Sequence, residues 1–162
     1  MNLGKAFIAG VIAGLVMGII MVIAHSTGMT PMNMPMYQGS MMTGEATSTA
    51  WWLGMFSHLI VSGLIALVYA VGFEYIAKKS TWLIGAAFGF VHWIIAGIFL
   101  GMMSNIHPLM QDGRLDAPGF FAANFGSVSI VAVLLLHIIY GAIVGAIYTT
   151  NQVVADGELD TV

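Results

Sequence analysis

The chain has 162 residues, of which 59% are hydrophobic and only 7% are charged, and its formal net charge is −3. Soluble domains carry about 25% charged residues, so this composition favours an integral membrane protein whose main partner is the lipid bilayer. The four lysine and arginine residues are too few for a basic surface that binds nucleic acid. The absence of cysteine excludes disulfides, thiolate metal sites and covalent c-type haem.

Four apolar segments are long enough to cross the hydrocarbon core of a bilayer, which takes about 20 helical residues. The predicted spans cover about 6–25, 52–77, 82–103 and 127–149. Backbone polar groups in lipid must be satisfied within each segment. The sequence therefore predicts an all-α fold, an integral membrane four-transmembrane-helix bundle over residues 1–150, followed by a short acidic tail at 151–162.

The first span carries a stripe of small residues that favours close packing against another helix. Gly10, Gly14 and Gly18 recur every four residues, and the same face reaches His25 at the outer rim. The junction IAHST after this span lacks a small-x-small cleavage site, so we predict that the span is retained.

The loop predicted at 26–51 is rich in methionine, proline and glycine. Its run Met32-Asn33-Met34-Pro35-Met36 would place three thioethers on one side of an extended segment, and Pro35 favours extended geometry at Met34. Soft thioethers select Cu(I), and the run resembles the methionine motifs of copper transporters and periplasmic copper carriers. Two interpretations stay open: the methionines ligate copper, or they fold onto the bundle as a hydrophobic lid.

The few cations predict the orientation of the bundle. Lys5 precedes the first span, and Lys78 and Lys79 fill the turn between the second and third spans. The positive-inside rule then puts the N- and C-termini in the cytoplasm. The loops 26–51 and 104–126 would face outward from a prokaryotic cytoplasmic (inner) membrane. Apart from Met1, every methionine falls in the predicted outer half or outer loops.

Each of the other three spans has a histidine on its own stripe of small residues. The shared faces are His58 with Ser62 and Ala66, His92 with Gly85 and Gly89, and His137 with Gly141 and Gly145. At 1.5 Å per residue the three imidazoles lie roughly 9 to 16 Å from the outer surface. We predict that they face inward at similar depths and share a metal ion or a haem. The alternative for each is a hydrogen bond between helices.

The last loop, 104–126, contains His107, Asp112 and Asp116 without the spacing of a helical metal site, and we expect a solvated loop with turns. Earlier in the chain, PMNMP follows the first span, and the second span contains a histidine. The loop itself contains HP and APGFFAANFG, and LLLHIIYGAIVGAIY follows in the final span. This arrangement resembles a family of small, uncharacterised four-span prokaryotic membrane proteins. The resemblance covers most of the chain and implies the four-span architecture but no activity.

No nucleophile–base pair, phosphate loop or dinucleotide fingerprint occurs in the sequence, so catalysis has no support. The first hypothesis is a protein that binds a transition metal, most favourably copper. Its predicted ligands are His25, His58, His92, His137, Met32, Met34 and Met36. The second is an accessory or structural subunit of a larger, possibly respiratory, membrane complex, or a homo-oligomer. The third is a b-type haem electron-transfer protein with haem held by His58, His92 and His137.

Overall fold

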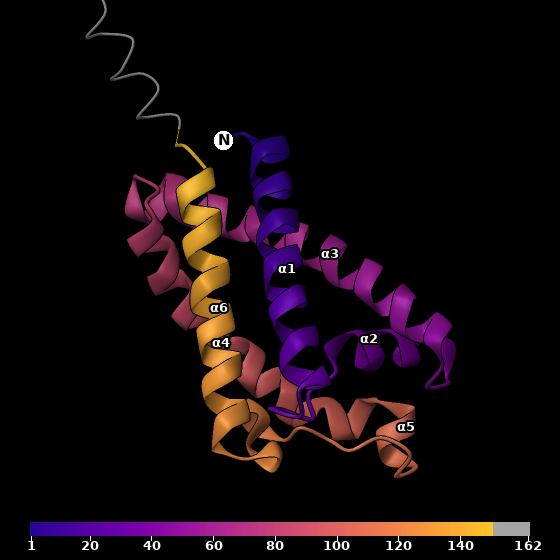
Figure 1. Ribbon diagram of the computed structural model, residues 1–162. Helices are drawn as coiled ribbons and strands as arrows, with labels where there is room; N and C mark the ends of the chain where they lie inside the picture. Colours follow the sequence, from indigo (N-terminus) through magenta and orange to yellow (C-terminus); the bar gives the residue numbers. More distant parts are fainter. Residues whose placement is uncertain (151–162) are drawn as a thin grey trace, which may run out of the picture.

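The computed structural model describes residues 1–150, and the predicted tail at 151–162 lies outside them. Four helices in the described part are long and apolar enough to cross a membrane (Figure 1). They are α1 (Leu3–Ser26), α3 (Ser48–Val71) with its π-helical extension η1 (Gly72–Ala77), α4 (Trp82–Ile106) and α6 (Ser127–Ile147). The predicted all-α, four-span architecture is confirmed.

Both predicted loops contain helical segments. The first holds α2 (Met34–Thr43), and the second holds α5 (Pro108–Gln111) and the 3₁₀ segment η2 (Phe120–Phe125). The prediction of an extended methionine segment is wrong, because Met34 and Met36 both belong to α2. The Asn33 side chain caps this helix by accepting the Met36 N–H at 3.2 Å, and Pro35 occupies its first turn, which is where proline favours a helix.

Glycine contacts hold the spanning helices close together. α1 packs on α3, and a Cβ added at Gly10 or Gly14 would collide with Ser62. α4 packs on α6, where a Cβ at Gly85 would collide with the Gly141 carbonyl and a Cβ at Gly141 with the Gly85 carbonyl. The predicted stripes of small residues therefore do form helix–helix contacts.

The short helix α2 packs against α3 as closely as the spanning helices pack against each other. A Cβ at Gly39 would collide with the Ala50 carbonyl, and one at Gly54 with the Pro35 carbonyl. α2 thus covers the beginning of α3 by backbone-to-backbone contact, and a larger side chain at either glycine would separate the two helices.

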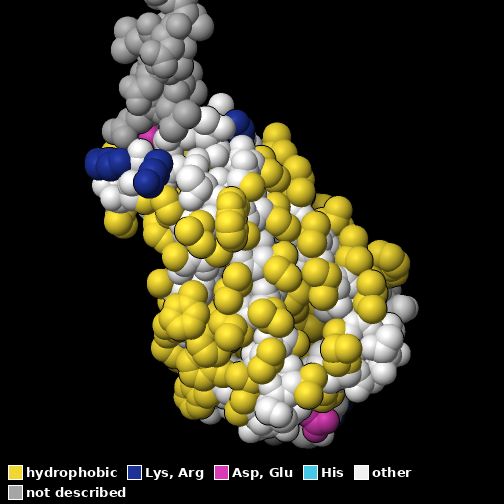
Figure 2. Space-filling view, turned by 60° about the vertical axis from the view of Figure 1, so that its left-hand side comes forward, with side chains coloured by type: hydrophobic (Ala, Val, Ile, Leu, Met, Phe, Trp, Pro, Cys, Tyr) yellow, Lys and Arg dark blue, Asp and Glu magenta, His cyan; other side chains and the backbone are white. Residues whose placement is uncertain are grey.

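All three lysines and both chain ends of the described part gather at one end of the bundle, which we call the lysine end. The Lys5 ammonium donates to the Thr149 hydroxyl at 2.8 Å, and the Ser80 hydroxyl, next to Lys79, donates to the Tyr148 carbonyl. Figure 2 shows cationic side chains at this end and mainly hydrophobic side chains along the visible flank. We call the opposite end, which carries α2 and α5, the α2 end.

The interior divides into two clusters. The aromatic cluster, toward the lysine end, includes Tyr69, Phe73, Phe88, Tyr140 and Tyr148. The methionine cluster, toward the α2 end, includes the buried side chains of Met21, Met32, Met103 and Met110. The uneven distribution of methionine along the sequence therefore corresponds to one half of the core. Packing explains part of this uneven distribution, since methionine side chains fill irregular gaps in a core.

Tyr37 on α2 gives a pH-dependent test of how α2 is packed. Its side chain is 4% exposed, and burial, aided by the negative charge of Asp116, raises its pKa to about 12. An unpacked tyrosine titrates near pH 10, so above that pH unpacking of α2 releases a proton and the packed state loses stability. Between pH 8 and 11 we expect the unaltered protein to lose about 1 kcal/mol more stability than Tyr37→Phe, measured by unfolding in detergent. Equal losses would contradict burial of this hydroxyl.

Candidate functional site

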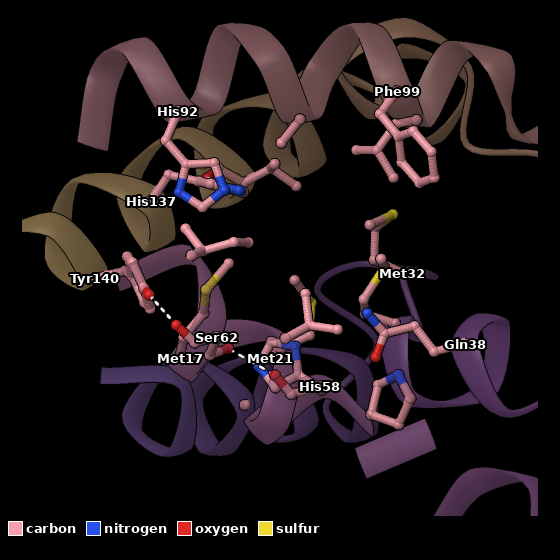
Figure 3. A pocket seen from close by; sticks show the side chains of 18 of the residues that line it. Met17, Met21, Met32, Gln38, His58, Ser62, His92, Phe99, His137 and Tyr140 are labelled. Atoms are coloured by element: carbon pink, nitrogen blue, oxygen red, sulfur yellow. Dashed lines mark hydrogen bonds between the residues drawn. The ribbon is translucent and has the colours of Figure 1, made fainter. Parts of the chain in front are cut away.

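A cavity of about 300 Å³ lies inside the bundle between the aromatic and methionine clusters (Figure 3). All four spanning helices, α2 and the segment that leads into α2 contribute to its wall. The side chains that bear donor atoms are His58, His92, His137, Met17, Met21, Met32, Met34, Gln38, Ser62 and Tyr140. Thus His58, His92 and His137 share one cavity.

Two of these histidines are in direct contact. The rings of His92 on α4 and His137 on α6 lie edge to face, with centroids 4.6 Å apart and planes at 83°. Gly89 makes this approach possible, because a Cβ there would collide with the backbone carbonyl of His137. The glycine stripe that joins α4 to α6 therefore also determines the spacing of the two imidazoles.

Hydrogen bonds fix the orientation of the pair. His137 Nδ1 lies 2.7 Å from the Val133 carbonyl oxygen. A carbonyl only accepts, so Nδ1 carries the proton and Nε2 keeps a lone pair. His92 Nδ1 lies 3.2 Å from the Tyr69 hydroxyl oxygen. The other ring nitrogen of His92, Nε2, makes no hydrogen bond to Tyr69. In His137 one ring nitrogen donates to a carbonyl while the other keeps its lone pair, which is the usual arrangement of a metal-binding histidine.

His58 on α3 has the opposite tautomer. Its Nε2 lies 3.1 Å from the Gly14 carbonyl oxygen, so Nε2 is the donor and Nδ1 is left as an acceptor. The Ser62 hydroxyl donates to the His58 carbonyl at 2.7 Å rather than to the ring. Figure 3 shows His58 and Gln38 on the wall opposite His92 and Phe99.

The methionines that line the cavity differ in part from those predicted. Met32 and Met34 do line it, together with Met17 and Met21 from α1, whereas Met36 does not. The sequence did contain a signal for the pair on α1, since Met17 and Met21 continue the helix face of Gly14 and Gly18 at spacings of three and four. Gln38, the other missed residue, lies in α2, a helix that the loop prediction did not include.

Two histidines lie elsewhere than expected. The glycine stripe of the first span predicted His25 on the face that packs against other helices, and this is wrong, because His25 is exposed and its Nε2 lies 3.4 Å from the Asn33 side-chain nitrogen. His107 is fully buried rather than solvated. Its Nε2 donates to the Tyr37 carbonyl at 3.0 Å, so His107 ties the end of α4 to α2. Neither residue lines the cavity.

Within residues 1–150 no three side chains of the His, Cys, Asp and Glu type are arranged to hold one metal ion together. An ion held by the His92–His137 pair would need a donor of another kind. The thioethers in the cavity wall are the nearest chemical match, and nitrogen with thioether donors suits a soft ion.

Residues 1–156 of the chain match the model of DUF6789, a family of unknown function. No curated protein and no solved structure matches the chain.

Proposed function

Since the chain belongs to DUF6789, a family of unknown function that implies no activity, we propose from the cavity itself that the protein binds one Cu(I) ion inside the membrane. The ligands are His92, His137 and the Met17 thioether. The observation that carries the proposal is the close contact of two imidazoles in a cavity that thioethers also line.

The spacing of the pair supports a shared ion. With metal–nitrogen distances of about 2.0–2.1 Å, two imidazoles on one tetrahedral ion have ring centres roughly 5 Å apart. The 4.6 Å between the centroids of His92 and His137 requires only a small adjustment. Thioethers favour Cu(I) over Zn²⁺ and Cu(II), and the Met17 side chain points into the cavity in Figure 3. Met32 and Met34 also line the cavity and add two further thioethers to its wall.

Haem b is less well supported than a bare ion. Axial histidines sit on opposite faces of a haem with the macrocycle between their rings. Rings in edge contact at 4.6 Å leave no room for a macrocycle between them. A Soret band in mildly solubilised protein from native membranes would favour haem over copper.

A role as a subunit of a larger membrane complex is the second candidate. It is supported by α4, the least buried of the four spanning helices, whose exposed side chains include Ile95, Ile98 and Phe99. A partner helix or a second copy would cover this surface. Migration of the chain alone on a native gel, without a co-purified protein, would count against this role.

We also propose that the lysine end faces the cytoplasm of a prokaryotic inner membrane. The gathering of Lys5, Lys78 and Lys79 at that end is the supporting observation. The chain has no native cysteine, so single cysteines can be labelled cleanly. In intact cells a membrane-impermeant maleimide is expected to label Asp112→Cys and not Lys79→Cys, with both labelled after lysis. The reverse pattern would invert the orientation.

The direct test of the copper proposal is metal analysis. Protein purified under reducing conditions from copper-supplemented cells is expected to hold about one equivalent of copper. Competition with a colorimetric Cu(I) chelator then gives the affinity. Less than about a tenth of an equivalent of any transition metal would reject the proposal.

A further inference from the structure

The wall of the cavity is open between two helices that follow each other in the chain. α3 packs on α1 and α2, and α4 packs on α6 and η2, but α3 and α4 scarcely pack on each other. They come together near the lysine end, where the Phe73 and Phe88 rings stack with centroids 5.2 Å apart. From there they diverge toward the α2 end, as Figure 1 shows.

The side chains along this opening belong to the cavity and to the outer surface at once. Val61 of α3 is 38% exposed, and Ile95 and Phe99 of α4 are 63% and 50% exposed, and all three line the cavity. These are apolar residues in the middle of spanning helices, at the depth where a bilayer presents hydrocarbon. The cavity is therefore reached from the bilayer.

The α2 end of the cavity is closed by contrast. Met32 is 2% exposed and Pro35 is buried beside it. The Pro35 carbonyl sits against Gly54 so closely that a Cβ there would collide with it. Met34 and Gln38, which also line the cavity here, are half-buried, so this end is covered more completely than the side between α3 and α4.

Two acceptor atoms on the wall opposite α4 are available to a ligand. Gln38 Oε1 is buried and has no hydrogen-bond partner in the described part of the chain. His58 gives its only N–H to the Gly14 carbonyl, which leaves Nδ1 as an acceptor. A buried acceptor left unsatisfied costs about 1–3 kcal/mol. A ligand that supplies hydroxyl donors would remove that cost at Gln38 Oε1.

We propose that this part of the cavity binds a bilayer-soluble hydroquinone. Its hydroxyl groups donate to Gln38 Oε1 and His58 Nδ1, its ring lies among the apolar side chains, and its tail leaves between α3 and α4 into the lipid. The volume of about 300 Å³ is at the lower end of the range for small-molecule pockets, which suits one substituted ring.

The hydroquinone and the copper ion use different groups. The ion is assigned to His92, His137 and Met17, and the hydroquinone to His58 and Gln38. The inference does not require copper, so the experiment uses metal-free protein. Loss of hydroquinone binding and loss of copper binding are then separate results.

The test is a binding measurement with metal-free protein in lipid nanodiscs, using decylhydroquinone and its oxidised form, decylbenzoquinone. We expect the hydroquinone to bind at least tenfold more tightly than the quinone. Gln38→Leu is expected to abolish that preference, because it removes the acceptor and keeps a side chain of similar size. Ala96→Phe, which extends a side chain into the cavity near the opening, is expected to weaken binding at least tenfold. Ile98→Phe, an exposed position on α4 that does not line the cavity, is the matched control and is expected to bind normally.

Three results would overturn the proposal. One is equal affinity for the two probes or no binding of either. Another is an equal effect of Ala96→Phe and Ile98→Phe, which would mean that the ligand does not enter the cavity. The third is efficient disulfide formation between copies of Ile95→Cys in native membranes, which would show that a second copy covers the opening. Ala96→Phe can also disturb folding. The preference for hydroquinone over quinone in Gln38→Leu is therefore compared directly with that of the unaltered protein.

Discussion

Protein carrying His137→Leu is expected to retain less than about a tenth of the copper held by the unaltered chain. His137 supplies an oriented Nε2 donor, since its other ring nitrogen is held by Val133 at 2.7 Å. Changes to groups that only orient a ligand already reduce metal affinity about 10–100-fold, so removal of the ligand itself has a larger effect. Leucine keeps most of the side-chain volume, which limits the cost to packing. The measurement is bound copper per chain after purification under reducing conditions.

The matched control is His25→Ala. His25 is exposed and lies outside the cavity, so this variant is expected to retain the full complement of copper. A second comparison tests the thioethers. Met17→Leu removes a proposed ligand and is expected to weaken Cu(I) binding more than about a hundredfold, whereas Met36→Leu is expected to leave it unchanged. Retention of copper by His137→Leu, or its loss from His25→Ala, would contradict the assignment of the ligands.

Gly85→Ala is expected to destabilise the bundle by about 3 kcal/mol, the upper part of the usual range for overpacking. The added methyl group would meet the Gly141 backbone carbonyl, which cannot move away as a flexible side chain can. α4 must then separate from α6, and His92 moves away from His137. The variant is therefore expected to lose copper affinity together with stability, measured by unfolding in detergent and by chelator competition.

Gly4→Ala is the control for this prediction. Gly4 also lies in a helix, but the nearest atom to an added Cβ is the Asn2 side-chain oxygen at 3.8 Å. The change is expected to be neutral or slightly stabilising, because alanine is the better helix former. If Gly85→Ala were as stable as Gly4→Ala, α4 and α6 would not pack as closely as the glycine contacts require.

Much of the fold could be predicted from local sequence. Hydropathy is a property of each segment, and 18 or more consecutive apolar residues identify a span without reference to the rest of the chain. The periodic glycines predicted which helix faces pack, and counting residues placed His58, His92 and His137 at similar depth. Each of these features depends on spacing within one helix, where the rise and turn per residue are constant.

The remaining features depend on contacts between residues far apart in the chain. Whether His92 meets His137 or His58 depends on how closely Gly89 lets α6 approach, and that closeness is a property of two helices together. His107 is buried only because α2 lies over it and the Tyr37 carbonyl accepts its proton. No pattern within the segment around His107 contains that information.

By itself, the amino-acid sequence determined that this is a four-span helical membrane protein. It also placed the histidines of three spans at similar depth and, apart from Met1, the methionines toward one end. Only the tertiary structure decided that Met17 rather than Met36 lies at the cavity, that α2 is a helix sealed onto α3, and that α3 and α4 leave an opening to the lipid. The reason is physical. Burial in a bilayer follows from the composition of each segment, whereas a cavity is the space left when particular helices pack on some neighbours and not on others.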